Sequence, residues 1–468
     1  MKTFYSFLLT AVCFFAITNK AFGQFSGGDG SENNPYIITT AEQLAQLATF
    51  VNNGNESYDG KFYKLGNDIS LSAYQSGAGW TPIGYGENYF NGNFDGNGKK
   101  ITDLYINNPN LDFVGLFGQI YGSEIKNLAV ESVNVHGKDY VGGITGDCYA
   151  SRINDCYSTG NVSGNSKVGG VAGITSSSTF AVDISWLSGC YFTGNVTGND
   201  YVGGITGRVY YYSGLGSCYS IGKVSGNEDV GGVIGGIYNG AASTCYSISE
   251  VSGINYVGGI IGSLSGAWDY IMSLNNCVAL NPSVKAAGEY VGRIAGYNGK
   301  TLYDNAAYDG ILNFNGNATW DNKGSSSKDG EDMTLQQIKS DGTLGNRFKS
   351  TNGWTIQNGK LPGLFGQAVN MPAHLGGVGI ASTTLSDPIR VYPNPVNEQL
   401  TINNEQLIIN NVEIFDVMGR VVYTVETRLI ASLQQSATTI NISHLPSSVY
   451  FVKIYTENGV VTQKIIKK

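Results

Sequence analysis

The sequence predicts an all-β protein: a parallel β-solenoid (β-helix) with capped ends, followed by a small C-terminal β-sandwich. Glycine supplies 65 of 468 residues and only 14% of residues are charged, a composition that does not fit a helical bundle or a coiled coil. A glycine-rich segment recurs through the middle of the chain without helical periodicity. Short alternating apolar runs separated by turn formers fill the C-terminal region, which is typical of a sandwich.

Residues 1–23 are predicted to be a secretory signal peptide. Lys2 gives a positive start, the apolar run from Phe4 to Ile17 is too short to span a bilayer, and Ala21 and Gly23 give the small-x-small form of a cleavage site. No later stretch is apolar enough to cross a membrane, so we expect no transmembrane segment in the mature chain. The mature protein is therefore expected to be exported, and to be soluble or held at a surface by other means.

Residues 24–112 are predicted to form an N-terminal cap region with one short helix at Thr39 to Asn53. Thr40 and Gln43 have the spacing of a capping box at its start. Four apolar residues share one face of this helix: Leu44, Leu47, Phe50 and Val51. We expect the helix to cover an end of the solenoid, because open strand edges would otherwise pair with neighbouring molecules.

Residues 113–310 carry the repeats. The segment Tyr140 to Gly146 returns six times in full or shortened form, and its register position falls at 115, 143, 170, 204, 232, 259 and 293. One copy therefore spans roughly 28 residues, too few to bury an apolar side alone, whereas stacked coils share a continuous core. Glycine at a fixed register suits a corner that needs positive φ or a close backbone approach.

One cysteine recurs in each of five repeats and is predicted to point inward. The members of this column are Cys156, Cys190, Cys218, Cys245 and Cys277. Side chains alternate along a strand, and the first and last copies place Glu131 and Asp309 where water is expected, which puts the cysteine position inside. Small thiols stacked coil on coil are favoured over disulfides, and no C-x-x-C or nearby histidine suggests zinc.

The residue after the cysteine is then predicted to face outward, and it is tyrosine on four consecutive coils: Tyr157, Tyr191, Tyr219 and Tyr246. One interpretation is a self-stacked ladder that supports the surface of the sheet. The other is an exposed, ligand-binding stripe that stacks on sugar rings or forms the apolar centre of a protein contact.

A polar column precedes the aromatic or charged register residue: Asp139, Ser166, Asp200, Glu228, Asn255 and Glu289. Oxygen ligands close together could hold Ca²⁺, but turns are also polar for solvation alone. The solvated turn is favoured, and we expect neither a metal site nor a cofactor.

Catalytic signals are weak. The three histidines, His136, His374 and His444, lie in different regions, which gives little support to a Ser-His-Asp or Cys-His site. Asp147 and Asp155 flank one turn with Arg152 between them, and local solvation is the simpler account. The chain is therefore not expected to be an enzyme. The alternative is a β-helix polysaccharide lyase or glycoside hydrolase, which needs carboxylates clustered on one face.

Residues 311–366 are predicted to be the C-terminal cap of the solenoid. Asp332 to Ser340, Trp354 to Ile356 and Leu361 to Leu364 are the segments expected to close this end. Residues 367–390 read as a linker, and residues 391–468 as the sandwich.

Two stretches resemble known families. The repeats resemble the GLUG motif, and Trp80 to Gly84 and Phe90 to Gly98 look like the segment that precedes such repeats; that resemblance implies a bacterial surface or adhesin-like protein. Val391 to Pro395, Phe415 to Arg420, Leu445 to Val452 and the terminal Lys464 to Lys468 resemble the type A C-terminal sorting domain of the type IX secretion system. That resemblance implies a Bacteroidota origin, contact with the type IX machinery and transport across the outer membrane.

These observations together predict a secreted or cell-surface, non-catalytic, adhesin-like binding protein. The formal net charge of -8 argues against nucleic acid as a partner, because phosphates are gripped by Lys and Arg. The expected ligand is a glycan or a surface protein, since a repeated face suits polymers and other surfaces. A structural spacer remains a second alternative.

Overall fold

The structure is a computed structural model that describes residues 25–178, 184–267, 273–376, 390–403, 409–416, 421–424, 437–456 and 459–468. The predicted signal peptide lies outside the described residues, as does most of the predicted linker. The chain divides into two compact units, Met1–Val369 and Asn370–Lys468. Each unit is described by itself.

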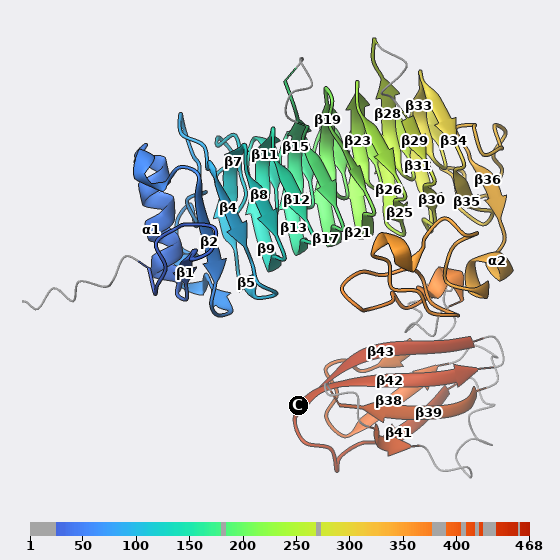
Figure 1. The fold of residues 1–468 in the computed structure, drawn as a ribbon. Helices are drawn as coiled ribbons and strands as arrows, with labels where there is room; N and C mark the ends of the chain where they lie inside the picture. Colours follow the sequence, from blue (N-terminus) through green and yellow to red (C-terminus); the bar gives the residue numbers. More distant parts are fainter. Residues whose placement is uncertain are drawn as a thin grey trace, which may run out of the picture. The chain divides into compact units, whose positions relative to one another are not determined.

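The first unit is a parallel β-solenoid, as predicted, and its strands follow one another along Figure 1 from blue to yellow. Each full coil contributes to four sheets, mostly with one strand in each. Sheet I contains β1 (Tyr36–Ile38), β2 (Lys61–Leu65), β4 (Gly92–Asp95), β8 (Glu124–Lys126), β12 (Arg152–Asn154), β16 (Trp186–Ser188), β20 (Gly214–Gly216), β24 (Ala241–Ser243), β29 (Ser273–Asn275) and β34 (Thr301–Tyr303). Sheet I thus begins well before the first glycine-rich repeat, because residues 36–95 already supply three of its parallel strands.

Sheet II carries most of the side chains of the candidate site described below. It contains β3 (Ile69–Ser70), β5 (Lys100–Thr102), β9 (Ala129–His136), β13 (Tyr157–Ser163), β17 (Tyr191–Thr197), β21 (Tyr219–Ser225), β25 (Tyr246–Ser247), β30 (Val278–Ala279), β35 (Ala306–Tyr308) and β36 (Glu331–Met333), together with β6 (Tyr105–Asn107), β26 (Glu250–Gly253) and β31 (Val284–Ala286).

The other two sheets complete each coil. Sheet III contains β10 (Asp139–Gly142), β14 (Ser166–Gly169), β18 (Asp200–Gly203), β22 (Glu228–Gly231), β27 (Asn255–Gly258) and β32 (Val291–Gly292). Sheet IV contains β7 (Phe117–Tyr121), β11 (Thr145–Tyr149), β15 (Ala172–Ser176), β19 (Thr206–Tyr210), β23 (Ile234–Tyr238), β28 (Ile261–Ser265) and β33 (Ala295–Asn298).

Helix α1 (Ala41–Asn52) forms where the sequence predicts it. The Thr40 hydroxyl accepts a hydrogen bond from the Gln43 backbone N–H, and Leu44, Leu47 and Val51 are buried. The return bond of the capping box is displaced by one residue, because Gln43 Oε1 accepts from the backbone N–H of Thr39 at 2.8 Å. The described residues of the first unit also form three short 3₁₀ helices: η1 (Glu56–Tyr58), η2 (Ser72–Tyr74) and η3 (Ser350–Asn352).

The register glycines serve close backbone approach, whereas positive φ lies elsewhere. A Cβ added at Gly204 would lie 2.1 Å from the carbonyl oxygen of Gly232, and one at Gly232 would lie 2.1 Å from that of Gly259. The left-handed corner is occupied by larger residues, with φ of 60° at Tyr140 and 54° at Tyr201. Neighbouring coils therefore leave no room for a side chain at Gly204 and Gly232, while the corner tolerates strained non-glycine residues because the stack fixes them.

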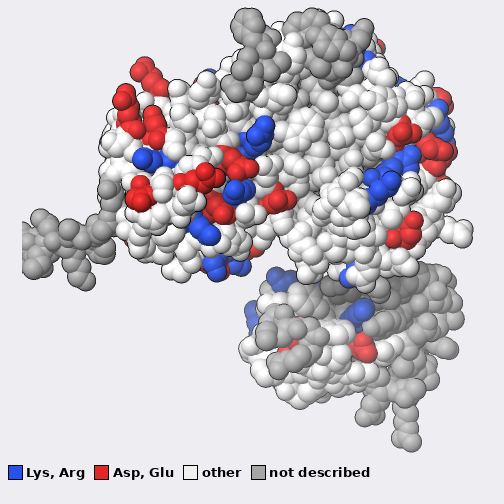
Figure 2. Space-filling model, viewed as in Figure 1, with Lys and Arg blue, Asp and Glu red and all other residues white. Residues whose placement is uncertain are grey.

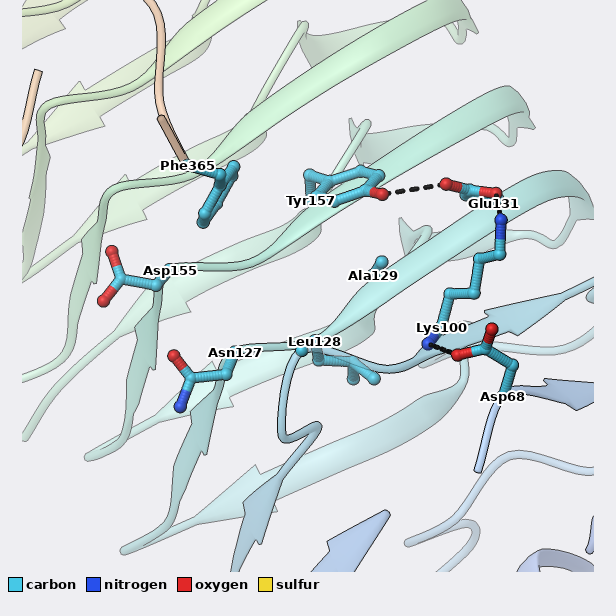
Figure 3. Close-up of a pocket in the computed structure, with 10 residues that line it drawn as sticks. Asp68, Lys100, Asn127, Leu128, Ala129, Glu131, Asp155, Tyr157 and Phe365 are labelled. Atoms are coloured by element: carbon cyan, nitrogen blue, oxygen red, sulfur yellow. Dashed lines mark hydrogen bonds and ion pairs between the residues drawn. The ribbon is translucent and has the colours of Figure 1, made fainter. Parts of the chain in front are cut away.

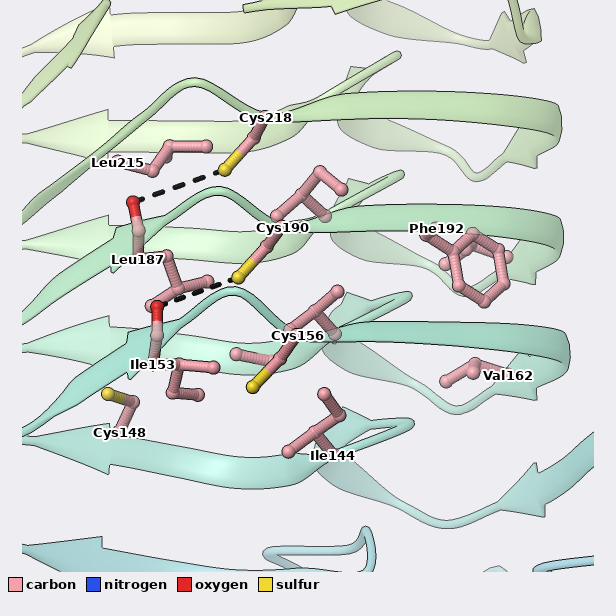
Figure 4. Packing of buried hydrophobic residues seen from close by; sticks show 14 of the residues in the cluster. Ile144, Cys148, Ile153, Cys156, Val162, Leu187, Cys190, Phe192, Leu215 and Cys218 are labelled. Carbon is pink, nitrogen blue, oxygen red and sulfur yellow. Dashed lines mark hydrogen bonds between the residues drawn. The ribbon is translucent and has the colours of Figure 1, made fainter. Parts of the chain in front are cut away.

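The cysteine column is buried and free of disulfides, as predicted. Figure 4 shows the thiols of successive coils lying one above another inside the solenoid. Cys190 Sγ donates to the carbonyl oxygen of Ile153 at 3.5 Å, one coil away, and to that of Ser188 at 3.3 Å. Burial raises the pKa of Cys156 and Cys218 well above the ordinary thiol value, which keeps these groups protonated.

One of the three segments predicted to close the C-terminal end of the solenoid lies there, and the other two do not. Strand β36 adds a last rung to sheet II and leads into α2 (Leu335–Ser340), so Asp332 to Ser340 lie at the end. Arg293 stands at the register position where other copies have glycine; its buried guanidinium pairs with Asp332 at 2.7 Å. Trp354 and Pro362 do not close the end, because they lie against the outer side of sheet II.

The second unit consists of two antiparallel sheets around one small core. One contains β37 (Arg390–Tyr392), β38 (Gln399–Asn403) and β41 (Ala437–Asn441); the other contains β40 (Val421–Thr424), β39 (Ile409–Phe415), β42 (Ser448–Thr456) and β43 (Gly459–Lys467). Alternate residues of these strands are buried together, among them Leu400, Ile402, Val412, Ile414, Val452 and Ile454. The 3₁₀ helix η4 (Ala373–Leu375) precedes them. In the parts of the chain that the structure describes, no helix is long and apolar enough to cross a membrane.

Candidate ligand-binding pocket at the end of a tyrosine ladder

Four tyrosine side chains form a stacked ladder on the outside of sheet II. Strands β13, β17, β21 and β25 pair in register, which puts Tyr157, Tyr191, Tyr219 and Tyr246 in one column. Successive ring centroids are 4.5, 4.8 and 5.0 Å apart, with interplanar angles of 6–7°. Since parallel strands lie roughly 4.8 Å apart, the spacing of the backbone alone brings the rings into face-to-face contact. The structure thus shows the self-stacked ladder that was one of the two interpretations of this column.

The expectation that all four rings face water is wrong for two of them. Tyr219 is 5% exposed and Tyr246 is 0% exposed. The non-repeating residues 341–369 cover them: Phe348 packs edge-on against Tyr246 at 5.6 Å, and the Trp354 ring lies 5.9 Å from Tyr246 and 6.2 Å from Tyr219. This segment is drawn in orange alongside the last coils in Figure 1. The Tyr246 hydroxyl donates to the carbonyl oxygen of Pro362 at 2.6 Å, which ties the segment to the ladder.

The other half of the ladder is only partly covered. Tyr157 and Tyr191 are half-buried, and the Phe365 ring tilts across both at 5.8 and 5.7 Å. Phe365 is itself 45% exposed, an unusual position for a large apolar side chain. These three rings give the first unit an accessible aromatic corner.

The ladder ends because its column changes residue type. Ala129 on β9 is the register partner of Tyr157, and Lys100 on β5 is the partner of Ala129. A methyl group and then a lysine therefore follow the last ring, and the column has a gap beside Tyr157. A cavity of ≈ 460 Å³ opens there, as Figure 3 shows, and its lining comprises Asp68, Gly98, Lys100, Asn127, Leu128, Ala129, Glu131, Asp155, Tyr157 and Phe365.

Glu131 is the polar centre of this pocket. Its carboxylate accepts a hydrogen bond from the Tyr157 hydroxyl at 2.8 Å and pairs with Lys100 Nζ at 3.1 Å (Figure 3). Asp68 accepts from the backbone N–H of Lys100 at 3.1 Å on the far side. Tyr157 is thereby held in one orientation at the end of the ladder.

Burial shifts the pKa of Asp155, Tyr157 and Tyr191, which lie at or beside the pocket. It raises the pKa of Asp155 above the usual carboxyl range, and it raises the pKa of Tyr191 to about 12. Burial together with the bond to Glu131 also raises the pKa of Tyr157. Figure 2 shows acidic and basic side chains interspersed over the N-terminal coils.

The predicted catalytic candidates do not come together. Asp147 belongs to β11 in sheet IV, whereas Asp155 follows β12 at the corner between sheets I and II. Arg152 lines a different cavity, with Ser151 and Ile184. His136 bonds to Ser163 on the outside of sheet II, at 2.9 Å. Within the described ranges, no three His, Cys, Asp or Glu side chains are placed to hold a metal ion.

Two sets of hydrogen bonds link successive turns: one joins Asp139 of the predicted polar column to a ladder of asparagines that directly precede other members of the column, and the other joins two members of the column. Asn165 Nδ2 donates to Asp139 at 2.9 Å, Asn199 donates to Asn165 at 2.7 Å, and Asn227 donates to Asn199 at 3.0 Å. Asn255 donates to Glu228 at 2.7 Å in the same way. The side-chain oxygens of Asp139, Glu228 and Asn255 therefore accept N–H groups of neighbouring coils.

Sequence reasoning missed the residues that complete the pocket. Lys100 and Ala129 precede the tyrosines in the same column, and aligning the first two coils with the repeats would have revealed the end of the ladder. No such signal exists for Phe365, which comes from a segment outside the repeats.

Residues 390–468 match the family described as "Secretion system C-terminal sorting domain". The chain therefore carries a sorting domain, which confirms the corresponding resemblance and indicates export by the type IX system to the cell surface or extracellular space. It also implies an interaction with the secretion machinery.

Two curated proteins are similar to part of the chain. A "Putative Gly-rich membrane protein" of Evansella cellulosilytica is 37% identical over 131 residues, which is 27% of this chain and 14% of that protein. Halomucin of Haloquadratum walsbyi is 31% identical over 164 residues, 34% of this chain and 2% of that protein. The chain spans only a small fraction of the length of both relatives.

A crystal structure described as a "putative immunoglobulin A1 protease" from Bacteroides ovatus has a similar fold. The TM-score is 0.51 with 20% sequence identity, over 74% of this chain and 96% of the other. At that identity the likeness concerns the fold alone.

Proposed function

We propose that this protein is a non-catalytic, adhesin-like binding protein that acts outside the cell and holds a glycan through the open end of its tyrosine ladder. The observation that carries the proposal is the accessible face of Tyr157, next to Phe365 and beside a cavity lined by carboxylates. Aromatic faces stack on the C–H faces of sugar rings, and carboxylates accept hydrogen bonds from sugar hydroxyls. The GLUG resemblance and the predicted signal peptide agree with this placement.

A glycan array probed with the exported chain tests the proposal. We expect binding to at least one glycan class, and the double variant Tyr157→Ser and Tyr191→Ser should weaken that binding at least tenfold. The matched control is Tyr303→Ser, since Tyr303 is 41% exposed but lies on β34 in sheet I. No binding to any glycan, or equal binding by the double variant and the control, contradicts the proposal and favours a structural spacer.

The second candidate is a glycoside hydrolase or lyase. Asp155 and Glu131 line the same cavity, and the raised pKa of Asp155 is a property of a general acid. Release of reducing sugar by the wild-type chain, lost in both Asp155→Asn and Glu131→Gln, would establish this activity in place of simple binding.

A further inference from the structure

We propose that the pocket takes a single pyranose ring, uncharged or bearing an amino group, in the place that a tyrosine ring would occupy at Ala129, and that it rejects acidic sugars. This inference rests on the proposed glycan binding and names its ligand class and its geometry.

The first step concerns which ring faces a ligand can reach. Tyr191 is sandwiched between Tyr157 and Tyr219, and Tyr219 between Tyr191 and Tyr246. Both faces of each inner ring are therefore already in contact with another ring. At the two ends of the ladder, Tyr246 is fully buried under Phe348 and Trp354, whereas Tyr157 has a face without a stacked ring on the side of Ala129. A ligand can thus stack at one position only, and the column cannot bind a polymer along its length.

The second step concerns the size of the gap. Ala129 is one rung and Lys100 two rungs beyond Tyr157, which at the strand spacing of a parallel sheet is roughly 4.8 and 9.6 Å. The ladder itself shows that ring neighbours need 4.5–5.0 Å. One ring therefore fits between Tyr157 and Lys100, as the next rung of the stack.

The third step distinguishes a sugar from an aromatic side chain of a partner protein. The cavity of ≈ 460 Å³ lies within the roughly 300–1,000 Å³ range of ligand pockets and is larger than one side-chain ring needs. Its rim carries acceptor oxygens from Asp68, Asn127, Glu131 and Asp155. A tyrosine side chain has one hydroxyl to offer to this rim, whereas a pyranose has several around its circumference, so the sugar satisfies the lining better.

The fourth step concerns charge. Three carboxylates line the cavity, and its one lysine is already paired with Glu131 at 3.1 Å. A uronate or sialate would add a negative charge among Asp68, Glu131 and Asp155, while an ammonium group would be attracted to them. The pocket therefore favours neutral hexoses and amino sugars.

The experiment fills the gap by substitution. In Ala129→Tyr the new ring occupies the proposed ligand position, so affinity for the neutral and amino-sugar probes, cellohexaose and chitosan hexamer, should fall at least a hundredfold in titration calorimetry. The melting temperature should stay equal or rise, because the ladder gains a rung. Asn195→Tyr is the matched control, since Asn195 is an exposed residue of β17 outside the pocket lining. If Ala129→Tyr fails to fold, Ala129→Leu fills part of the same space and should weaken binding at least tenfold.

Charge selectivity is measured with the same wild-type protein. Oligogalacturonate should bind at least tenfold more weakly than cellohexaose. Asp155→Asn should reduce this difference in affinity, because it removes one carboxylate from the pocket lining. If folded Ala129→Tyr binds the sugars as well as the wild type does, the proposed ligand position at Ala129 is wrong. If oligogalacturonate binds as tightly as cellohexaose, the proposed rejection of acidic sugars is wrong. In both cases binding that depends on Tyr157 would leave the proposed function standing. If no glycan binds, or if a protein with an exposed tyrosine binds and no glycan does, both the proposed glycan binding and the proposed pyranose site are wrong.

Discussion

Tyr246 and Tyr157 occupy the same column of the same sheet, three rungs apart, yet their surroundings differ completely. Tyr246 is fully buried under Phe348 and Trp354, and its hydroxyl is bound to Pro362. Tyr157 ends the ladder beside an open cavity and is bound to Glu131. The repeat supplies the ladder at both places. Whether a rung serves packing or is available for binding depends on where the non-repeating residues 341–369 lie.

The largest contrast should appear when each end of the ladder is truncated. Tyr246→Ala is expected to lower the free energy of unfolding by about 3–5 kcal/mol, as for other large buried rings. Tyr157→Ala should cost about 1 kcal/mol, because part of that ring already contacts water. Guanidinium unfolding followed by circular dichroism measures both. Equal losses would show that the covering segment contributes nothing to stability.

Trp354 tests how much the covering residues 341–369 contribute to stability, because its ring packs against Tyr219 and Tyr246. Trp354→Ala should cost about 3 kcal/mol, near the lower end for buried Trp, because the buried indole N–H of Trp354 has no hydrogen-bond partner to lose. Trp354→Phe is the control and should be close to neutral, since it keeps a ring against Tyr246. The same unfolding assay applies, and a large loss in Trp354→Phe would contradict the packing described above.

Alkaline pH should separate the covered rung from an ordinary tyrosine. Burial raises the pKa of Tyr246 well above the model-peptide value of 10.0, so the folded chain keeps this proton while the unfolded chain loses it. The contribution of protonated Tyr246 to the free energy of unfolding is therefore complete below pH 10 and decreases as the pH rises above 10. The free energy of unfolding should fall by about 1.4 kcal/mol per pH unit from this group. In Tyr246→Phe that slope should be shallower; an identical slope would mean that Tyr246 ionises in the folded state.

The smallest effect is expected in the exposed asparagine ladder. Asn199 donates to Asn165 and accepts from Asn227 on the surface, without a covering segment. Asn199→Ala should therefore cost about 1 kcal/mol or less in the unfolding assay. A loss as large as that of Tyr246→Ala would show that exposed ladders stabilise the stack as strongly as covered ones.

Several features follow directly from the sequence. Repetition predicts the rungs, and the alternation of side chains along a strand predicts inward cysteines followed by outward tyrosines. The Thr40 cap and the apolar face of α1 were predictable because helix capping and amphipathicity are local. The covering segment was not, since Pro362 meets Tyr246 across 116 residues of sequence.

The sequence alone therefore determined the stack, its interior column of thiols and the existence of a tyrosine column, because a fixed period forces equivalent residues into register. Only the tertiary structure decided which tyrosines are covered and where the column opens into a pocket. Those outcomes depend on the path of residues 341–369, which do not repeat. They also depend on the first coils, whose position in the stack is visible only from the pairing of their strands.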